Sequence, residues 1–70
     1  MADAGREELR PLLERALGDD DGWARWKALR GLVELNPEPS REAISALARD
    51  RDFRVRLEVA NFLDGPQRAD

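Results

Sequence analysis

Apolar residues in the first third of the chain recur with the spacing of one helix face. They stand at positions i, i+3, i+4, i+7 and i+8, as Leu9, Leu12, Leu13, Ala16 and Leu17. This spacing predicts an amphipathic helix. Pro11 suits the first turn of a helix that begins near Leu9 or Arg10, because its missing N–H is not needed there. Gly18 is expected to end the helix in the left-handed conformation.

An acidic turn leads into a second helix. Asp21 is a good N-cap, and Asp19 and Asp20 bring negative charge close to the positive end of the helix dipole. Asn36-Pro37 ends this helix, since asparagine tolerates the left-handed cap and proline cannot continue the hydrogen-bond ladder.

The second helix has more apolar positions than one stripe can hold. One face is made by Ala24, Ala28, Leu32 and Leu35. Leu29 and Gly31 stand at the edges of that face, and Trp23 and Trp26 begin a different one. The tryptophans therefore need a separate explanation.

Two further helices are predicted in the second half. Ser40 is the expected N-cap of the third helix, whose core positions are Ala43, Ile44, Leu47 and Ala48. The fourth runs from Phe53 to about Leu63 and is stopped by Gly65-Pro66. Its core candidates are Val55, Val59, Phe62 and Leu63. Strand signals are absent from the sequence.

The chain aligns with itself, without insertions, when its first half is placed on its second half. The identical pairs in this repeat register are Asp19 with Asp50, Asp21 with Asp52, Arg25 with Arg56, and Leu32 with Leu63. The similar pairs are Leu13 with Ile44, Leu17 with Ala48, Ala24 with Val55, and Ala28 with Val59. A period between about 20 and 50 residues is typical of solenoids. We therefore predict an all-α fold of four helices, in which two antiparallel helical hairpins stack as a minimal α-solenoid.

The predicted boundaries follow from the repeat register. We expect a frayed leader, a domain of two units and a mobile tail, at residues 1–5, 6–64 (units of about 6–36 and 37–64) and 65–70. Two units are fewer than such arrays usually need. Apolar residues near both ends therefore predict a homo-oligomer, docking onto a larger partner, or a piece of a longer solenoid. The initial methionine and the polar tail favour a complete small protein.

Two segments carry a family resemblance. Residues 16–29 (ALGDDDGWARWKAL) and 50–56 (DRDFRVR) resemble HEAT-like repeats of the short, phycobilisome-lyase type. In that pattern Ala-Leu ends a first helix, an Asp-x-Asp turn follows, and Val-Arg and small residues begin a second helix. Ala24 replaces the usual valine, and residues 57–62 are bulkier than the family's small run. The resemblance covers about residues 6–63 and implies a binding scaffold.

Composition narrows the chemistry. The 70 residues include no cysteine and no histidine, which removes disulfides, thiolate metal sites and the usual general base. The net charge of -3 argues against a dedicated nucleic-acid binder. No apolar run approaches the roughly 20 residues that span a bilayer, and no signal peptide is evident. We expect a cytoplasmic protein that is not an enzyme and has no cofactor.

Six charged residues around the two turns allow two interpretations. They are Asp19, Asp21, Arg25, Asp50, Asp52 and Arg56. Carboxylates in pairs can hold a metal ion or transfer protons. We favour a structural role instead: N-caps for the second helices, and the Asp–Arg ladder between neighbouring turns that the family resemblance implies. No metal site is predicted.

The candidate partner-binding residues lie on the second helices, away from the predicted core stripe. They are Trp23, Trp26, Lys27, Arg30, Arg54, Leu57, Glu58 and Asn61. The resemblance implies that they face the concave side of the solenoid. Tryptophan and arginine dominate binding hot spots, so we expect a non-catalytic protein-interaction surface. The indoles could instead cover the small core, or contact a second copy.

Two other functions stay open. The lyase-type resemblance allows an accessory or chaperone-like subunit of a larger enzyme or complex. An arginine cluster, consisting of Arg49, Arg51, Arg54 and Arg56, could contact nucleic-acid phosphates. Acidic residues interleave with these arginines, so we favour a surface whose charges are paired internally, and no membrane contact is expected.

Overall fold

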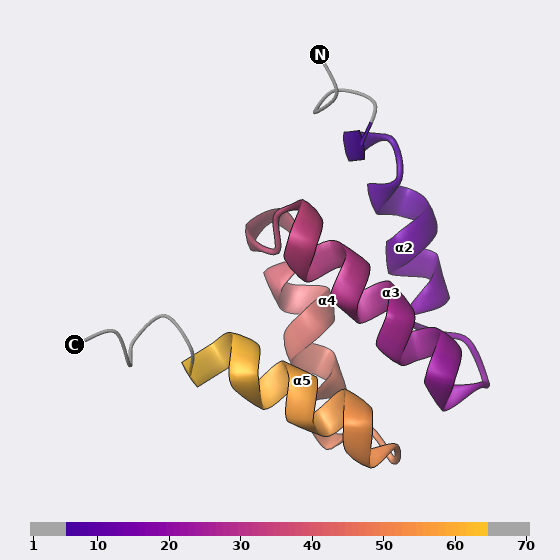
Figure 1. The fold of residues 1–70 in the computed structure, drawn as a ribbon, viewed down its shortest axis with the longest axis vertical. Helices are drawn as coiled ribbons and strands as arrows, with labels where there is room; N and C mark the ends of the chain where they lie inside the picture. The colour runs from indigo at the N-terminus through magenta and orange to yellow at the C-terminus, as the bar shows by residue number, and fades with distance from the viewer. Residues whose placement is uncertain (1–5, 65–70) are drawn as a thin grey trace.

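The computed structural model describes residues 6–64, and this part of the chain is helical without strands (Figure 1). The helices are α2 (Arg10–Ala16), α3 (Gly22–Leu35), η1 (Glu38–Ser40), α4 (Arg41–Ser45), η2 (Ala46–Arg49) and α5 (Phe53–Asp64). The short segments η1, α4 and η2 together occupy the place of the predicted third helix. The all-α fold of two stacked helical hairpins is confirmed. The predicted leader and tail, with the stop at Gly65-Pro66, lie outside the described residues.

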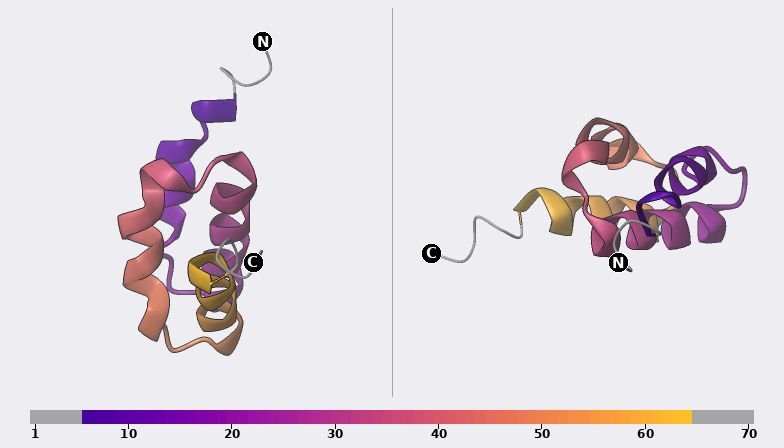
Figure 2. Two further views of the ribbon diagram at one scale, coloured as in Figure 1. Left: turned by 90° about the vertical axis from the view of Figure 1, so that its left-hand side faces the viewer. Right: turned by 90° about the horizontal axis from the view of Figure 1, so that it is seen from above.

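The helices form two layers. Seen from above, α2 and α4 lie in one layer and α3 and α5 in the other (Figure 2). Contacts are most numerous between α2 and α3 within the first unit, and between α3 and α5 across the two units. The second helices therefore make the main joint of the array.

The helix ends differ from the predicted ones. Pro11 stands in the first turn of α2 as expected. Gly18 is not left-handed, because no described residue has a φ in the left-handed region. The chain leaves α2 through tighter bonds instead, with the Gly18 N–H donating to the Arg15 carbonyl at 3.1 Å. Asn36 is extended at φ 171°, and its side chain accepts the Glu38 N–H, so its predicted left-handed cap is also wrong.

Ser40 does not cap the third helix. Its side chain makes no capping bond, and the residue is buried. The hydroxyl donates to the Glu14 carboxylate and accepts a bond of 2.9 Å from Arg10. Arg10 also donates to the Asn36 carbonyl at 2.8 Å. These bonds join α2 to the connection between the two units.

The core lies between the layers and across both units. Its buried apolar residues are Leu17, Ala28, Leu29, Leu32, Ile44, Val55 and Val59. Leu29, predicted at an edge, is fully buried in the core cluster that also contains Val55 and Val59 of the second unit. Leu9 and Leu12, predicted on the core stripe, are exposed, and Ala48 is exposed as well. The predicted apolar surface near both ends is present at Leu9, Leu12, Phe53 and Leu57, whereas Val33 and Phe62 pack partly against the core.

Gly22 allows the two units to approach closely. A Cβ atom at this position would clash with the Asp52 carboxylate. The first residue of α3 therefore has to be small where the second turn packs against it.

Candidate interaction surface

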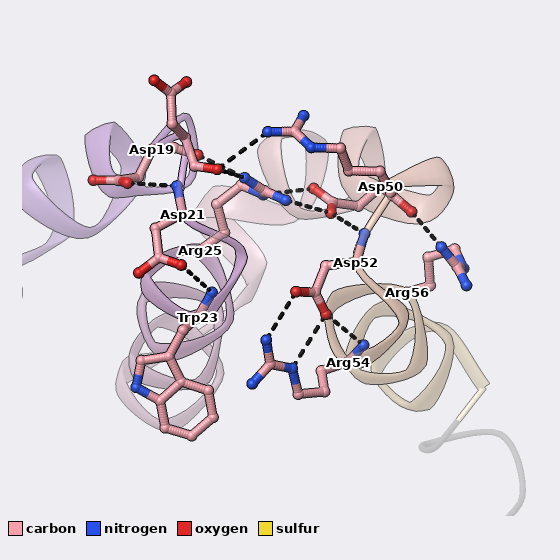
Figure 3. Close-up of polar contacts among 10 residues, drawn as sticks. Asp19, Asp21, Trp23, Arg25, Asp50, Asp52, Arg54 and Arg56 are labelled. Carbon is pink, nitrogen blue, oxygen red and sulfur yellow. Dashed lines mark hydrogen bonds and ion pairs between the residues drawn. The ribbon is translucent and has the colours of Figure 1, made fainter.

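The two acidic turns, which the repeat register places on one another, make the same hydrogen bonds (Figure 3). The Asp19 carboxylate accepts the Asp21 N–H at 2.8 Å, and the Asp50 carboxylate accepts the Asp52 N–H at the same distance. Asp21 and Asp52 then each accept the N–H two residues further on, at 3.2 and 2.8 Å. One aspartate of each pair shapes the turn, and the other caps the helix that follows.

Arg25 links the first turn to the second. Its Nε and Nη2 atoms donate to the Asp50 carboxylate at 2.8 and 2.9 Å, while Nη1 donates to the Asp19 carbonyl at 2.7 Å. The two side chains keep only 5% and 7% of their surfaces exposed. The guanidinium lowers the pKa of Asp50, because it stabilises the ionised carboxylate. This pair is the ladder that joins the units.

Arg56 repeats half of this arrangement. Its Nη1 atom donates to the Asp50 carbonyl at 2.8 Å, as Arg25 does to the Asp19 carbonyl. The residue is exposed, and no carboxylate in residues 6–64 forms an ion pair with it. Arg56 thus makes the bond to the carbonyl that Arg25 makes, but it lacks the carboxylate partner that Arg25 has in Asp50.

Trp23, Trp26 and Arg54 lie together at the joint between α3 and α5. The two indoles stack with their ring centres 5.0 Å apart and an angle of 21° between the planes. The Arg54 guanidinium lies 4.8 Å from the centre of the Trp23 ring. Trp23 stays 46% exposed, whereas Trp26 is half-buried and packs against the core. The two tryptophans therefore differ in role.

The other candidate residues continue this surface along both helices. Arg30 of α3 donates to Glu58 of α5 at 3.0 Å. Leu57 is 50% exposed, and Lys27 and Asn61 are exposed. Arg54 donates twice to the Asp52 carboxylate, at 3.2 and 2.9 Å, so its charge is paired within the chain. The exposed surface is therefore more aromatic and apolar than the sequence alone indicates.

Comparison with known families decides the class of the protein. A family model that describes HEAT repeats matches residues 2–66. This chain is a HEAT-repeat protein. The match does not distinguish the phycobilisome-lyase type from other HEAT repeats. No curated protein and no solved structure gave a match.

The arginine cluster of this HEAT-repeat protein is held mainly by internal partners. Arg51 donates to the Asp20 carbonyl at 3.1 Å, and Arg54 and Arg56 bond to the second turn. Within residues 6–64, no three acidic side chains converge in a group that could hold a metal ion. None of the described helices is long and apolar enough to span a bilayer.

One repeated ion pair was missed by the sequence reasoning. Arg10 binds Glu7 through two bonds of 2.8 and 2.9 Å, and Arg41 binds Glu38 in the same way at 2.9 and 3.1 Å. The four residues obey the repeat register, which therefore contained the signal. Ser40 lies between Glu38 and Arg41, and the sequence did not indicate its bonds, because its partners Arg10 and Glu14 belong to the other unit.

The stability of the HEAT-repeat fold is expected to fall in acid. The Arg54 side chain lowers the pKa of Asp52 from 3.8 to about 2. A carboxyl group with a lowered pKa stabilises the fold above its unfolded value and loses this effect as the pH falls through its folded value. Thermal melts followed by circular dichroism should therefore show a falling midpoint between about pH 4 and pH 2.

Asp52→Asn provides the control for this prediction. The variant should melt lower than the unchanged chain at neutral pH, and it should lose less further stability in the acid window. An equal acid loss in both chains would assign the effect to other carboxylates.

Proposed function

We propose that this chain is a non-catalytic protein-binding module that uses the second-helix surface. This surface consists of Trp23, Trp26, Lys27, Arg30, Arg54, Leu57, Glu58 and Asn61. HEAT repeats generally mediate protein–protein interactions, and the family match supports this class of function. The observation that carries the proposal is the exposed indole of Trp23, held between Trp26 and Arg54.

The geometry suits a binding hot spot. An exposed apolar side chain that is already fixed loses little conformational freedom when a partner covers it. Trp23 stacks on Trp26 on one side and meets Arg54 on another, so its orientation is set before binding. Leu57 adds exposed apolar area on α5, and the Arg30–Glu58 pair provides a polar rim.

The charges of the surface indicate the chemistry of the partner. Arg54 and Arg30 are already paired with Asp52 and Glu58, so a strongly acidic partner would gain little from them. We infer an apolar or aromatic docking segment, with polar groups at its edge, that covers Trp23 and Leu57.

The test compares two leucines of similar exposure on different surfaces. Affinity purification from the native host with the unchanged chain as bait identifies candidate partners. Trp23→Ala and Leu57→Ala are expected to reduce the recovery of a true partner at least ten-fold, a typical loss at a hot spot. Leu12→Ala, on α2, removes a leucine that is 61% exposed and should leave recovery unchanged.

Circular dichroism completes the comparison. Trp23→Ala and Leu57→Ala should keep the helical signal, whereas Trp26→Ala should lower the melting temperature because that indole packs against the core. Equal recovery with all three surface variants would contradict the proposed surface. The accessory-subunit and nucleic-acid functions, and the cytoplasmic location, stay predictions.

A further inference from the structure

Each end of the repeat array carries a hollow. The first, of about 540 Å³, lies on α2 and α3, and its walls include Leu13, Asp21 and Ala24. The second, of about 210 Å³, lies against η2 and α5. It is lined by Ala48, Arg56, Val59, Ala60, Leu63 and Asp64. The repeat register relates both hollows to the joint between the two units.

The hollow on α5 is lined by residues whose equivalents in unit one are buried or half-buried. The six residues that stand one repeat before its lining are Leu17, Arg25, Ala28, Leu29, Leu32 and Val33. All six are buried or packed against the core. At three positions the residue of unit one is buried and its equivalent is exposed: Leu17 and Ala48, Arg25 and Arg56, and Leu29 and Ala60. These differences mark what a neighbouring unit covers.

The hollow on α2 and α3 is lined by residues whose equivalents in unit two pack against unit one. Leu13 and Ala24 are half-buried walls of this hollow. Their equivalents in unit two, Ile44 and Val55, are fully buried in the core that both units share. The two ends of the chain thus present the two complementary halves of its internal interface.

The charged groups at the two ends are also the equivalents of groups that pair between the two units. Arg25 binds the Asp50 carboxylate with the Nε–Nη2 edge of its guanidinium, while Nη1 is held by a carbonyl. Arg56 is held by the equivalent carbonyl and has no carboxylate on that edge within residues 6–64. Asp19, the equivalent of Asp50, is exposed at the other end of the array. An oriented guanidinium edge is suited to a carboxylate that can accept two bonds.

We propose that a second copy of this chain docks head to tail on α5. The α2–α3 hairpin of the second copy covers the hollow on α5, and Arg56 of the first copy binds Asp19 of the second copy with the guanidinium edge that Arg25 uses for Asp50. A head-to-tail contact leaves one surface of each kind open at the ends, so it produces a series of assemblies and not a closed dimer. The docked hairpin shares Trp23 and Lys27, which also line the hollow on α2 and α3, with the proposed second-helix surface. The pair of Arg56 and Asp19 lies outside that surface, so variants of this pair test self-association separately from the binding of another protein.

Phe53 departs from the repeat register at this contact. It stands where unit one has Gly22, whose missing side chain lets Asp52 approach. A side chain at the Gly22 position would clash with Asp52, so Phe53 keeps Asp21 of the second copy further away than Asp52 lies from Gly22 within the chain. The association is therefore weak and reversible, and Phe53→Gly should lower its dissociation constant several-fold. A weaker association of Phe53→Gly would mean that the ring itself causes self-contact, which overturns the proposal.

Sedimentation equilibrium across a roughly hundred-fold concentration range tests the assembly. The expected result is an average mass that rises continuously beyond that of a dimer. A monomer throughout, or a mass that stops at the dimer, would overturn the head-to-tail contact.

Two variants with one altered end each sharpen the test. Asp19→Asn keeps the side-chain oxygen that accepts the Asp21 N–H but removes the charge, and Arg56→Ala removes the opposite partner. Each variant alone should lose the assembly. An equal mixture should form a one-to-one dimer and nothing larger, because only one pair of intact ends remains. Variants that assemble like the unchanged chain, or a mixture that stays monomeric, would contradict the proposal.

Discussion

Arg25→Ala is expected to lower the melting temperature of the chain strongly. The side chain is buried and bonds to the Asp50 carboxylate and the Asp19 carbonyl, so its loss leaves a buried carboxylate without its cation. Breaking a buried ion pair by removing one partner is among the most damaging single changes. We expect a fall in melting temperature on the order of 10–20 °C, measured by circular dichroism.

Arg56→Ala is the matched control, because it removes the same side chain one repeat later. Arg56 is exposed and makes one side-chain bond, to the Asp50 carbonyl. Its loss should change the melting temperature by no more than a few degrees when the chain is dilute. Equal losses in the two variants would show that the contact between the units contributes little beyond the turn itself.

Most of the fold that can be predicted from the sequence follows from helix periodicity and from the repeat register. Helix periodicity predicted the helical segments, and the alignment of the two halves predicted the pairing of the turns, which the hydrogen bonds of Asp19 and Asp50 repeat. These features depend on neighbouring residues in the sequence, and such local signals are readable without a structure.

The errors have a common cause, which is contact between the units. The apolar pattern of its own helix puts Leu29 at an edge, whereas the structure buries it in a core cluster to which both units contribute. The N-cap pattern assigns Ser40 to its own helix, whereas its hydroxyl donates to Glu14 of the first unit. A periodic pattern states which side of a helix is apolar but not which distant element packs against it.

The binding role of the candidate surface stays a prediction, and the structure describes only how its side chains lie. The repeat register grouped Trp23 with Arg54, and the structure places the guanidinium over the indole. Sequence reasoning could not assign the charge of Arg54 to Asp52, or separate the exposed Trp23 from the half-buried Trp26. Both distinctions depend on side-chain orientation at the joint between α3 and α5.

Leu29→Ala should be the most destabilising apolar substitution. Leu29 is fully buried in the core cluster to which both units contribute, so truncation leaves a cavity in that core. Buried leucine-to-alanine changes lower the free energy of unfolding by about 2–5 kcal/mol. Small domains have roughly 0.05–0.15 kcal/mol of stability per residue, so this loss removes a large part of the total. Urea unfolding followed by circular dichroism should show a lower midpoint with a similar slope.

Leu57→Ala makes the comparison specific to the joint. Leu57 lies on α5 and is half exposed, so the same chemical change should lower the free energy of unfolding by less than about 1 kcal/mol. If the two variants lost equal stability, the units would not share one core, and Leu29 would lie on an open face. A large loss at Leu29 alone would show that the two repeats unfold as one cooperative unit, because a cavity at their joint then destabilises both hairpins together.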